Sequence, residues 1–216
     1  MTLKKLPVST RFSIEIGAVI PDISRKLSEA MSLALNWGIE SKILTDAASG
    51  IISHPSTLPV ARAGAGAISF TDVVQMESKT RLQNPVWIGS QTIIPQLAAA
   101  VDIGNHAVFL SALSGTAGTA PVPSNLLGHP IIYTMGIQPK LGSKGDIILA
   151  SDLSYFKCVI FQDLLVQTSE SAHWSTGEIG LRCFMLLDMH PLPFNCITPN
   201  PDDLTESYGW ATTLLA

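Results

Sequence analysis

The feature that most constrains the fold is a long apolar stripe between Pro21 and Leu44. Apolar side chains recur there at spacings of three and four residues, which is the period of one face of an α-helix. The stripe consists of Ile23, Leu27, Ala30, Met31, Ala34, Leu35, Ile39 and Ile43. Asp22 or Ser24 can cap the first turn of this helix. The pattern predicts one long helix packed across a sheet, since a ligand groove is the rarer reason for such a stripe.

The segment before this helix alternates apolar and polar residues. Over residues 6–20, Phe12, Ile14 and Ile16 alternate with polar residues and glycine. A period of two is typical of a strand with one buried face. We therefore expect the chain to open with a strand that continues to Ile20.

The middle of the chain predicts alternating helices and strands. Residues 45–66 are rich in Ser, Gly, Pro and Ala, so they predict a long connecting loop. A second helix is expected to start at Ser69 or Thr71, with Asp72 in its first turn, and to end before Asn84. The elements expected after it are a strand at 86–88, a helix at 91–102, a strand at 106–110 and a surface loop at 114–124.

The last part of the chain predicts mainly strands. They are expected at 130–134, 146–150, 157–161 and 180–189. A polar tail follows from Thr198, with Tyr208 and Trp210 as its aromatic anchors. One long helix, a mixed centre and a strand-rich end predict an α+β architecture.

Composition narrows the functional classes. Only 14% of the 216 residues are charged, 46% are hydrophobic, and no apolar run reaches the roughly 18 residues of a membrane-spanning helix. Such a surface favours subunit association, so we expect a homo-oligomer. The net charge of −4 argues against a nucleic-acid-binding protein. The amino terminus has no signal-peptide pattern, which indicates a cytoplasmic origin.

Cys183 and His190 are the nearest approach to a nucleophile and its base. Strand alternation places Cys183 among apolar neighbours, where burial makes a thiol inert. Cys183, His190 and Cys196 also lack the spacing of a compact zinc site. The three cysteines, Cys158, Cys183 and Cys196, are therefore predicted to be reduced and unpaired.

The remaining candidates for binding chemistry are weak. Asp202, Asp203 and Glu206 could hold a divalent cation, but a solvated acidic turn is the more ordinary interpretation. Three isolated histidines lack a partner in the sequence: His54, His106 and His129. The glycines of residues 63–66 match no nucleotide-binding motif. We therefore predict no catalytic, cofactor-binding or metal site, and a protein that is not an enzyme.

Several stretches, taken in order, resemble the major capsid proteins of tailed bacteriophages, whose Hong-Kong-97-type fold is shared with encapsulin nanocompartments. Residues 2–6 and 20–24 resemble the return strand of the family's extended loop entering its spine helix, and residues 49–55 a turn after that helix. The helix and strand of 70–74 and 84–90 are similar to those of the axial domain. The most specific stretches are Asn125-Leu-Leu-Gly-His-Pro-Ile-Ile132 and Gly145-Asp-Ile-Ile-Leu-Ala-Ser-Asp-Leu-Ser-Tyr155, and Ile179-Gly-Leu-Arg-Cys183 resembles a strand that returns to the peripheral domain.

The resemblance implies a domain plan. Residues 1–20 would be the return strand of a truncated extended loop. The peripheral domain would hold the spine helix and the following loop at 21–68 and strands at 158–197. The axial domain would span 69–157, with the loop from Met135 to Gly145 toward the capsomer centre, and 198–216 would be a C-terminal tail.

The resemblance also implies a function. The chain would be a structural subunit of a virus or prophage capsid shell, assembled in the bacterial cytoplasm into pentamers and hexamers and located in the virion. Its partners would be further copies and other virion proteins, without sequence-specific nucleic acid, membrane or cofactor. The alternatives are an encapsulin-like compartment, a degenerate non-assembling prophage remnant, and a small hydrolase using Cys183 and His190.

One departure concerns the start of the chain. Family members carry an amino-terminal arm and the first strand of the extended loop before the return strand, at which this sequence begins. We expect a remnant prophage gene, a minimal assembling variant, or a chain completed by another polypeptide.

Overall fold

The computed structural model describes residues 4–20, 22–64, 66–81, 83–99, 125–137, 142, 144–193, 195–197 and 207–215. The chain divides into two compact units. The first comprises Met1–Ile43 and Cys158–His190, and the second comprises Leu44–Lys157 and Pro191–Ala216. Both units contain helices and strands, which confirms the predicted α+β class.

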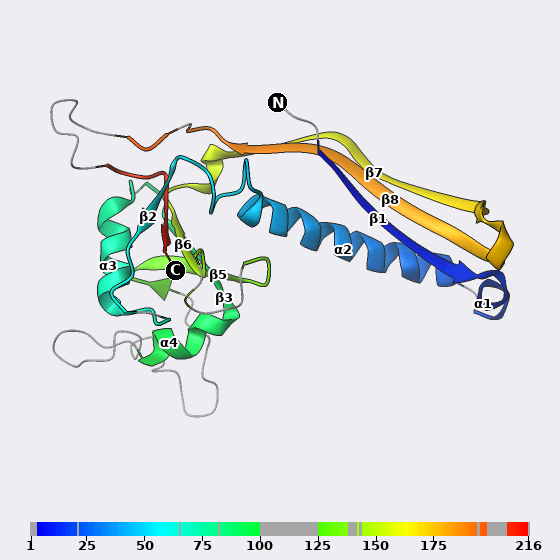
Figure 1. Cartoon of the computed structure of the whole chain (residues 1–216), viewed down its shortest axis with the longest axis horizontal. Coiled ribbons are helices and arrows are strands. Elements are labelled where there is room, and N and C mark those ends of the chain that lie inside the picture. Colours follow the sequence, from blue (N-terminus) through cyan, green and yellow to red (C-terminus); the bar gives the residue numbers. More distant parts are fainter. Residues whose placement is uncertain are drawn as a thin grey trace. The chain divides into compact units, whose positions relative to one another are not determined.

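The first unit is a three-stranded sheet with one long helix along it (Figure 1). Its strands, in spatial order, are β1 (Lys4–Ser13), β8 (Glu178–Pro191) and β7 (Phe156–His173). The helix α2 (Ile23–Thr45) matches the predicted bounds. The short helix η3 (Trp174–Thr176) lies between β7 and β8 in the chain.

The core of the first unit forms where the apolar stripe of α2 meets the sheet. Met31 and Leu35 of α2 pack with Leu181 and Cys183 of β8, and Leu6, Val8 and Leu27 complete the cluster. Alternate residues of β1 are partly buried and exposed, as a strand with one covered face requires. The predicted helix across a sheet is confirmed.

The predicted opening strand is wrong beyond Ser13. Residues Ile14–Val19 form a short helix, α1, whose first turn is capped by the Ser13 hydroxyl accepting from the Glu15 amide at 3.3 Å. Strand β8 begins at Glu178, directly opposite Ser13, so the chain has no strand to pair with after that point. Alternation at Ile14 and Ile16 therefore does not reflect strand pairing.

The second unit contains a six-stranded sheet. The strands in spatial order are β2 (Thr57–Val60), β9 (Ala211–Leu214), β6 (Ile147–Ala150), β3 (Val86–Ser90), β5 (His129–Thr134) and β4 (Asn125–Leu126). The helical elements are α3 (Phe70–Lys79), η1 (Gln91–Ile93), α4 (Ile94–Ala99) and η2 (Leu153–Tyr155). Predicted elements at 106–110 and 114–124 lie outside the described residues.

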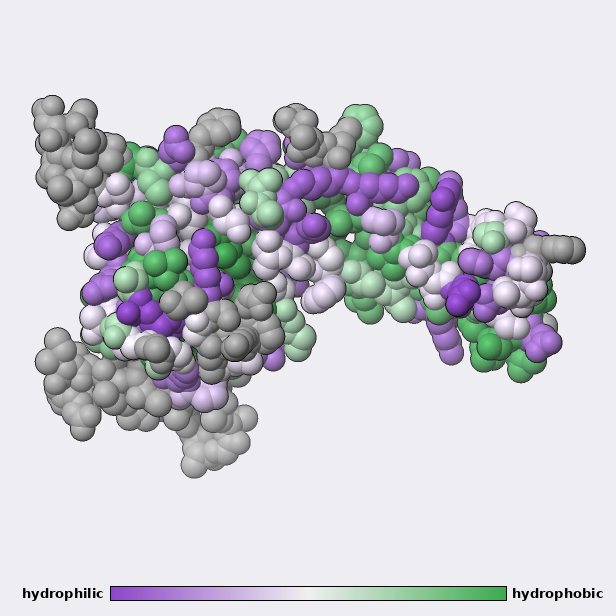
Figure 2. Space-filling view, in the orientation of Figure 1, coloured by the Kyte–Doolittle hydropathy of each residue, from purple (hydrophilic) through white to green (hydrophobic). Residues whose placement is uncertain are grey.

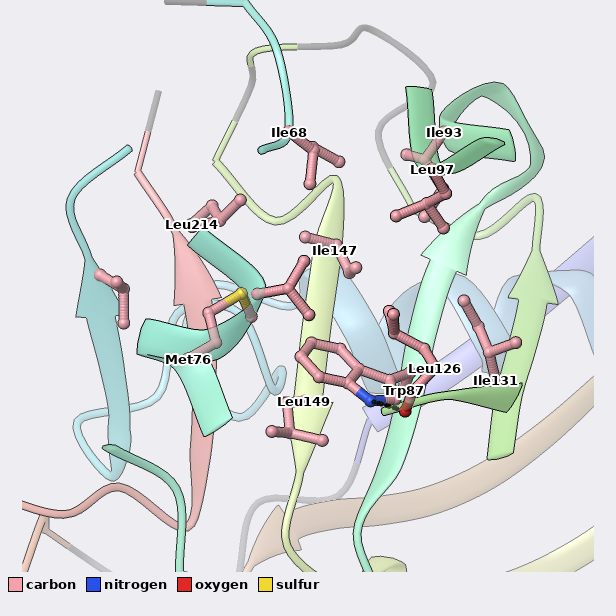
Figure 3. Packing of buried hydrophobic residues seen from close by; sticks show 12 residues of the cluster. Ile68, Met76, Trp87, Ile93, Leu97, Leu126, Ile131, Ile147, Leu149 and Leu214 are labelled. Atoms are coloured by element: carbon pink, nitrogen blue, oxygen red, sulfur yellow. Dashed lines mark hydrogen bonds between the residues drawn. The ribbon is translucent and has the colours of Figure 1, made fainter. Parts of the chain in front are cut away.

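Trp87 lies at the centre of the second core (Figure 3). Its side chain is fully buried, and its indole Nε1 donates to the Leu126 carbonyl at 3.0 Å. Met76 of α3 packs in the same cluster. The start of α3 is fixed by a capping box, in which the Ser69 and Asp72 side chains each accept from the other's backbone amide. The sequence predicted Ser69 or Thr71 as the start of this helix, with Asp72 in its first turn.

Three strands of this sheet were missed by the sequence prediction: the two-residue β4, and also β2 and β9. Strand β2 lies within the predicted loop 45–66, and β9 lies within the predicted polar tail 198–216. β9 pairs with β2 and β6, although Thr212 and Thr213 are polar and fully buried. The Thr212 hydroxyl bonds that of Thr80 at 2.8 Å, so the polarity of β9 is satisfied inside the core.

The predicted anchor Trp210 is buried beside β9. Its Nε1 donates to the Asp152 carbonyl at 3.1 Å, and its ring stacks on Phe156 with centroids 6.5 Å apart.

In the first unit, β7 extends to His173, well beyond the predicted end at Phe161.

A buried ion pair joins three segments of the second unit. The Arg62 Nη2 lies 2.9 and 3.0 Å from the two carboxylate oxygens of Asp146, and both side chains are almost completely buried. Arg62 also donates to the carbonyls of Leu215 and Ala67, and Asp146 accepts from the Gly142 amide. The pair thus ties the segment after β2 and the end of β9 to the start of β6.

We predict that Asp146→Asn lowers the free energy of unfolding by about 3–5 kcal/mol, because the Arg62 guanidinium would stay buried without its counterion. Urea denaturation measures this loss. The matched control is Arg25→Gln, which breaks the exposed Arg25–Glu29 pair of 2.8 Å and should cost under about 1 kcal/mol. Equal losses in the two variants would contradict the structural role given to the buried pair.

Candidate assembly surfaces

Cys183 and His190 do not form a catalytic pair. Cys183 is 1% exposed in the core beneath α2, and burial raises the pKa of its thiol. The two residues are seven positions apart on β8, so their side chains point to opposite faces of the sheet. His190 instead lies with its Nδ1 4.0 Å from an Asp188 carboxylate oxygen.

The other candidate ligands are dispersed. Cys196 donates its thiol to the Pro55 carbonyl at 3.4 Å, and Cys158 is exposed on β7. His54 bonds the Ser56 hydroxyl, and His129 lies 3.2 Å from Glu77. Over the described residues, no three His, Cys, Asp or Glu side chains are grouped to hold a metal ion. His106, Asp202, Asp203 and Glu206 lie outside the described residues.

The most conspicuous surface of the first unit is the apolar edge strand β7. Among the described residues, β7 is paired on one side only, by β8. It exposes five large apolar side chains, of which Phe161 is 71% accessible: Val159, Ile160, Phe161, Leu164 and Val166. An edge strand of this length is normally protected by charges or covered by another chain, since its open backbone groups can pair with another strand.

A second apolar surface lies at α1. Ile14, Ile16, Val19 and Ile20 are all exposed, and Val19 is 78% accessible. Figure 2 shows hydrophobic side chains gathered at the end of the first unit that carries α1. We call this surface, with Glu15, the α1 tip.

The sheet face away from α2 is polar and holds a groove. Because Leu181 and Cys183 face α2, Arg182 between them faces away, and the strand register places Ser9 beside Arg182 and Arg11 beside Gly180. These residues line a hollow of about 780 Å³ with Gln167, Ser169 and His173 of β7. We call it the arginine groove.

The two arginines of the groove are held by local partners. Arg182 donates its Nε to the Gln167 side chain at 2.8 Å, and Arg11 pairs with Glu178 at 3.2 Å. Beside the groove, the Lys5 ammonium lies 4.3 Å from the centre of the Phe184 ring. This face therefore presents cations to an incoming partner.

These surfaces favour association over chemistry. Contiguous exposed apolar side chains mark sites where another macromolecule binds. No helix within the described ranges combines the length and the apolar character needed to cross a bilayer. The sequence contained the apolar run at 158–161 but no pattern that predicted its exposure, because a buried strand has the same composition.

The sequence matches no protein-family model and no curated protein. Several solved structures match almost the whole chain. The capsid of an empty GTA particle computed with C5 symmetry matches with a TM-score of 0.73 at 12% identity, over 99% of this chain and 74% of that chain. The Gordonia phage Cozz structure matches with a TM-score of 0.67 at 13% identity, over 99% and 70%.

A further match is the holo-SrpI encapsulin complex from Synechococcus elongatus, with a TM-score of 0.67 at 12% identity, over 98% of this chain and 73% of that chain. The chain has the Hong-Kong-97-type capsid fold. The predicted resemblance is thereby confirmed at the level of the fold. The long α2 along the three-stranded sheet and the separate six-stranded unit are the elements of this capsid fold in the present chain.

We predict that Cys183 is the slowest of the three thiols to react in the folded protein, because it alone is buried, while burial raises the pKa of all three thiols. Cys158 should react first, since its side chain is exposed. Labelling near neutral pH followed by mass spectrometry of the peptides measures both rates, with the urea-unfolded chain as the control in which the rates converge. Fast labelling of Cys183 in the folded chain would revive the hydrolase alternative.

Proposed function

We propose that this chain is a non-enzymatic structural subunit of a virus or prophage capsid shell, which associates with further copies in pentamers and hexamers. The observation that carries the proposal is the match of 99% of the chain to the GTA capsid and to the structures of a Gordonia phage and a Mycobacterium phage. The location would be the virion, after assembly in the bacterial cytoplasm. Other virion proteins are further partners, and no membrane or sequence-specific nucleic acid is required.

The exposed surfaces support this proposal physically. Val159, Ile160 and Phe161 lie on an edge strand with one free side, and the α1 tip adds a second apolar area. Association of copies would remove both surfaces from water, at roughly 25 cal/mol for each Å² of apolar area buried. A shell sums many such contacts, each of which can be weak.

We assign the first unit to the peripheral domain and the second unit to the axial domain of the capsid fold. The change of unit between Lys157 and Cys158 supports this assignment. We assign residues 44–68 to the axial domain rather than to the peripheral domain expected from the sequence, because β2 belongs to the six-stranded sheet. In the loop proposed for the capsomer centre, Met135 is 72% exposed, while residues 138–141 and 143 lie outside the described part of the chain.

The second candidate function is an encapsulin-like compartment shell, which the match to the Synechococcus elongatus encapsulin supports. The two candidates share subunit association and differ in what is enclosed. A protein that stays with the purified shell through nuclease treatment would favour the compartment, and enclosed DNA would favour the capsid.

Negative-stain microscopy and light scattering of the purified chain test the shared claim. We predict rings of five or six subunits or closed shells, with mass rising as the concentration rises. A strict monomer at every concentration would contradict the proposal and identify a non-assembling remnant.

We predict that Phe161→Lys weakens association at least about tenfold, because it places a charge on the apolar edge strand. The matched control is Asn36→Lys, which adds the same charge at an exposed polar position of α2, outside the apolar edge and the arginine groove, and should change association little. Light scattering across a concentration series measures both variants. Equal effects would show that the apolar edge is not an assembly contact.

A further inference from the structure

We propose that the arginine groove of one copy receives the α1 tip of a second copy, with the Glu15 carboxylate binding the Arg182 guanidinium. The inference rests on the proposed self-association and goes beyond it by naming one contact and its two sides. It follows from two exposed surfaces of the first unit: the α1 tip carries a carboxylate, and the arginine groove carries a guanidinium.

The α1 tip is apolar and acidic. Four of its large side chains are exposed, although they lie within seven consecutive residues. Glu15 stands among them with an exposed side chain, and its carboxylate has no hydrogen-bond or ion-pair partner among the described residues. The first turn of α1 holds no other acid, and its last turn holds no basic residue. The tip therefore offers one carboxylate on an apolar projection.

The arginine groove is hollow and cationic. Arg182 uses Nε for Gln167, and this bond fixes the plane of the guanidinium. The two Nη groups of Arg182 have no hydrogen-bond acceptor among the described residues, and they form the fork that binds a carboxylate through two parallel bonds. Gly180 forms the floor, where an added Cβ would meet Ala172, Ser169 and His173 at 3.5–3.7 Å. The missing side chain keeps this floor open.

The charge of the arginine groove indicates which partner binds there. Arg11 is already paired with Glu178, which leaves Arg182 as the main unneutralised charge of the groove. One cation suits a single carboxylate better than a nucleic-acid backbone, whose binding requires several neutralised phosphates. A second copy supplies that carboxylate on the exposed α1 tip, so the contact pairs two charges that have no ion-pair partner within the described residues of one chain.

Charge exchange tests the contact. Glu15→Arg and Arg182→Glu should each weaken association about tenfold or more, because each places like charges together. The double variant carrying both changes should recover association to within about threefold of the wild type. The control is Arg25→Glu, an exposed arginine of α2 outside the groove, which should leave association unchanged. Circular dichroism confirms that each variant is folded.

Three results would overturn the inference. In the first, the single variants associate like the wild type. In the second, the loss of association free energy in the double variant equals the sum of the losses in the two single variants. Nuclease treatment could dissolve the assembly while Arg182→Glu releases bound nucleic acid, which would make nucleic acid the occupant. If Phe161→Lys prevents assembly and the groove variants do not, the groove inference fails and the shell function stands. A wild-type chain that never associates would contradict both the groove inference and the proposed shell function.

Discussion

The packing of α2 against β1 and β8 is the contact on which the first unit depends. Met31 and Leu35 meet Leu181 and Cys183 in its core, and a single helix covers one face of the sheet. β7 lies outside this core, with its apolar side chains exposed and one side of its backbone open. The contact that stabilises the unit therefore leaves the apolar edge of β7 exposed, and we propose that another copy of the chain covers it.

The second unit is stabilised by different means. Trp87 and Met76 lie in a core between α3 and the six-stranded sheet, and Arg62 and Asp146 connect segments that lie far apart in the sequence. A buried ion pair of this kind contributes little net stability when intact, but its geometry admits only one arrangement of the joined segments. The pair therefore fixes the segment after β2 and the end of β9 at the start of β6.

The sequence predicted those elements whose cause is local. The period of α2 and the start of α3 at Ser69, with Asp72 in its first turn, are encoded within a few residues and were found as expected, whereas the capping box that these two residues form was not predicted. β9 was missed because its threonines are satisfied by partners distant in the chain, and α1 because the end of β8 decides where β1 stops. The arginine groove combines side chains of three strands, so its assembly could not be predicted without the register.

The central claim is that the edge of β7 is completed by another copy of the chain. Hydrogen–deuterium exchange of the backbone amides, measured at low and high protein concentration, tests it most directly. The account predicts that peptides covering residues 159–166 gain protection as concentration rises, while peptides of β3 in the second core stay equally protected throughout. Unchanged exchange of β7 in a sample that has visibly assembled would contradict the account.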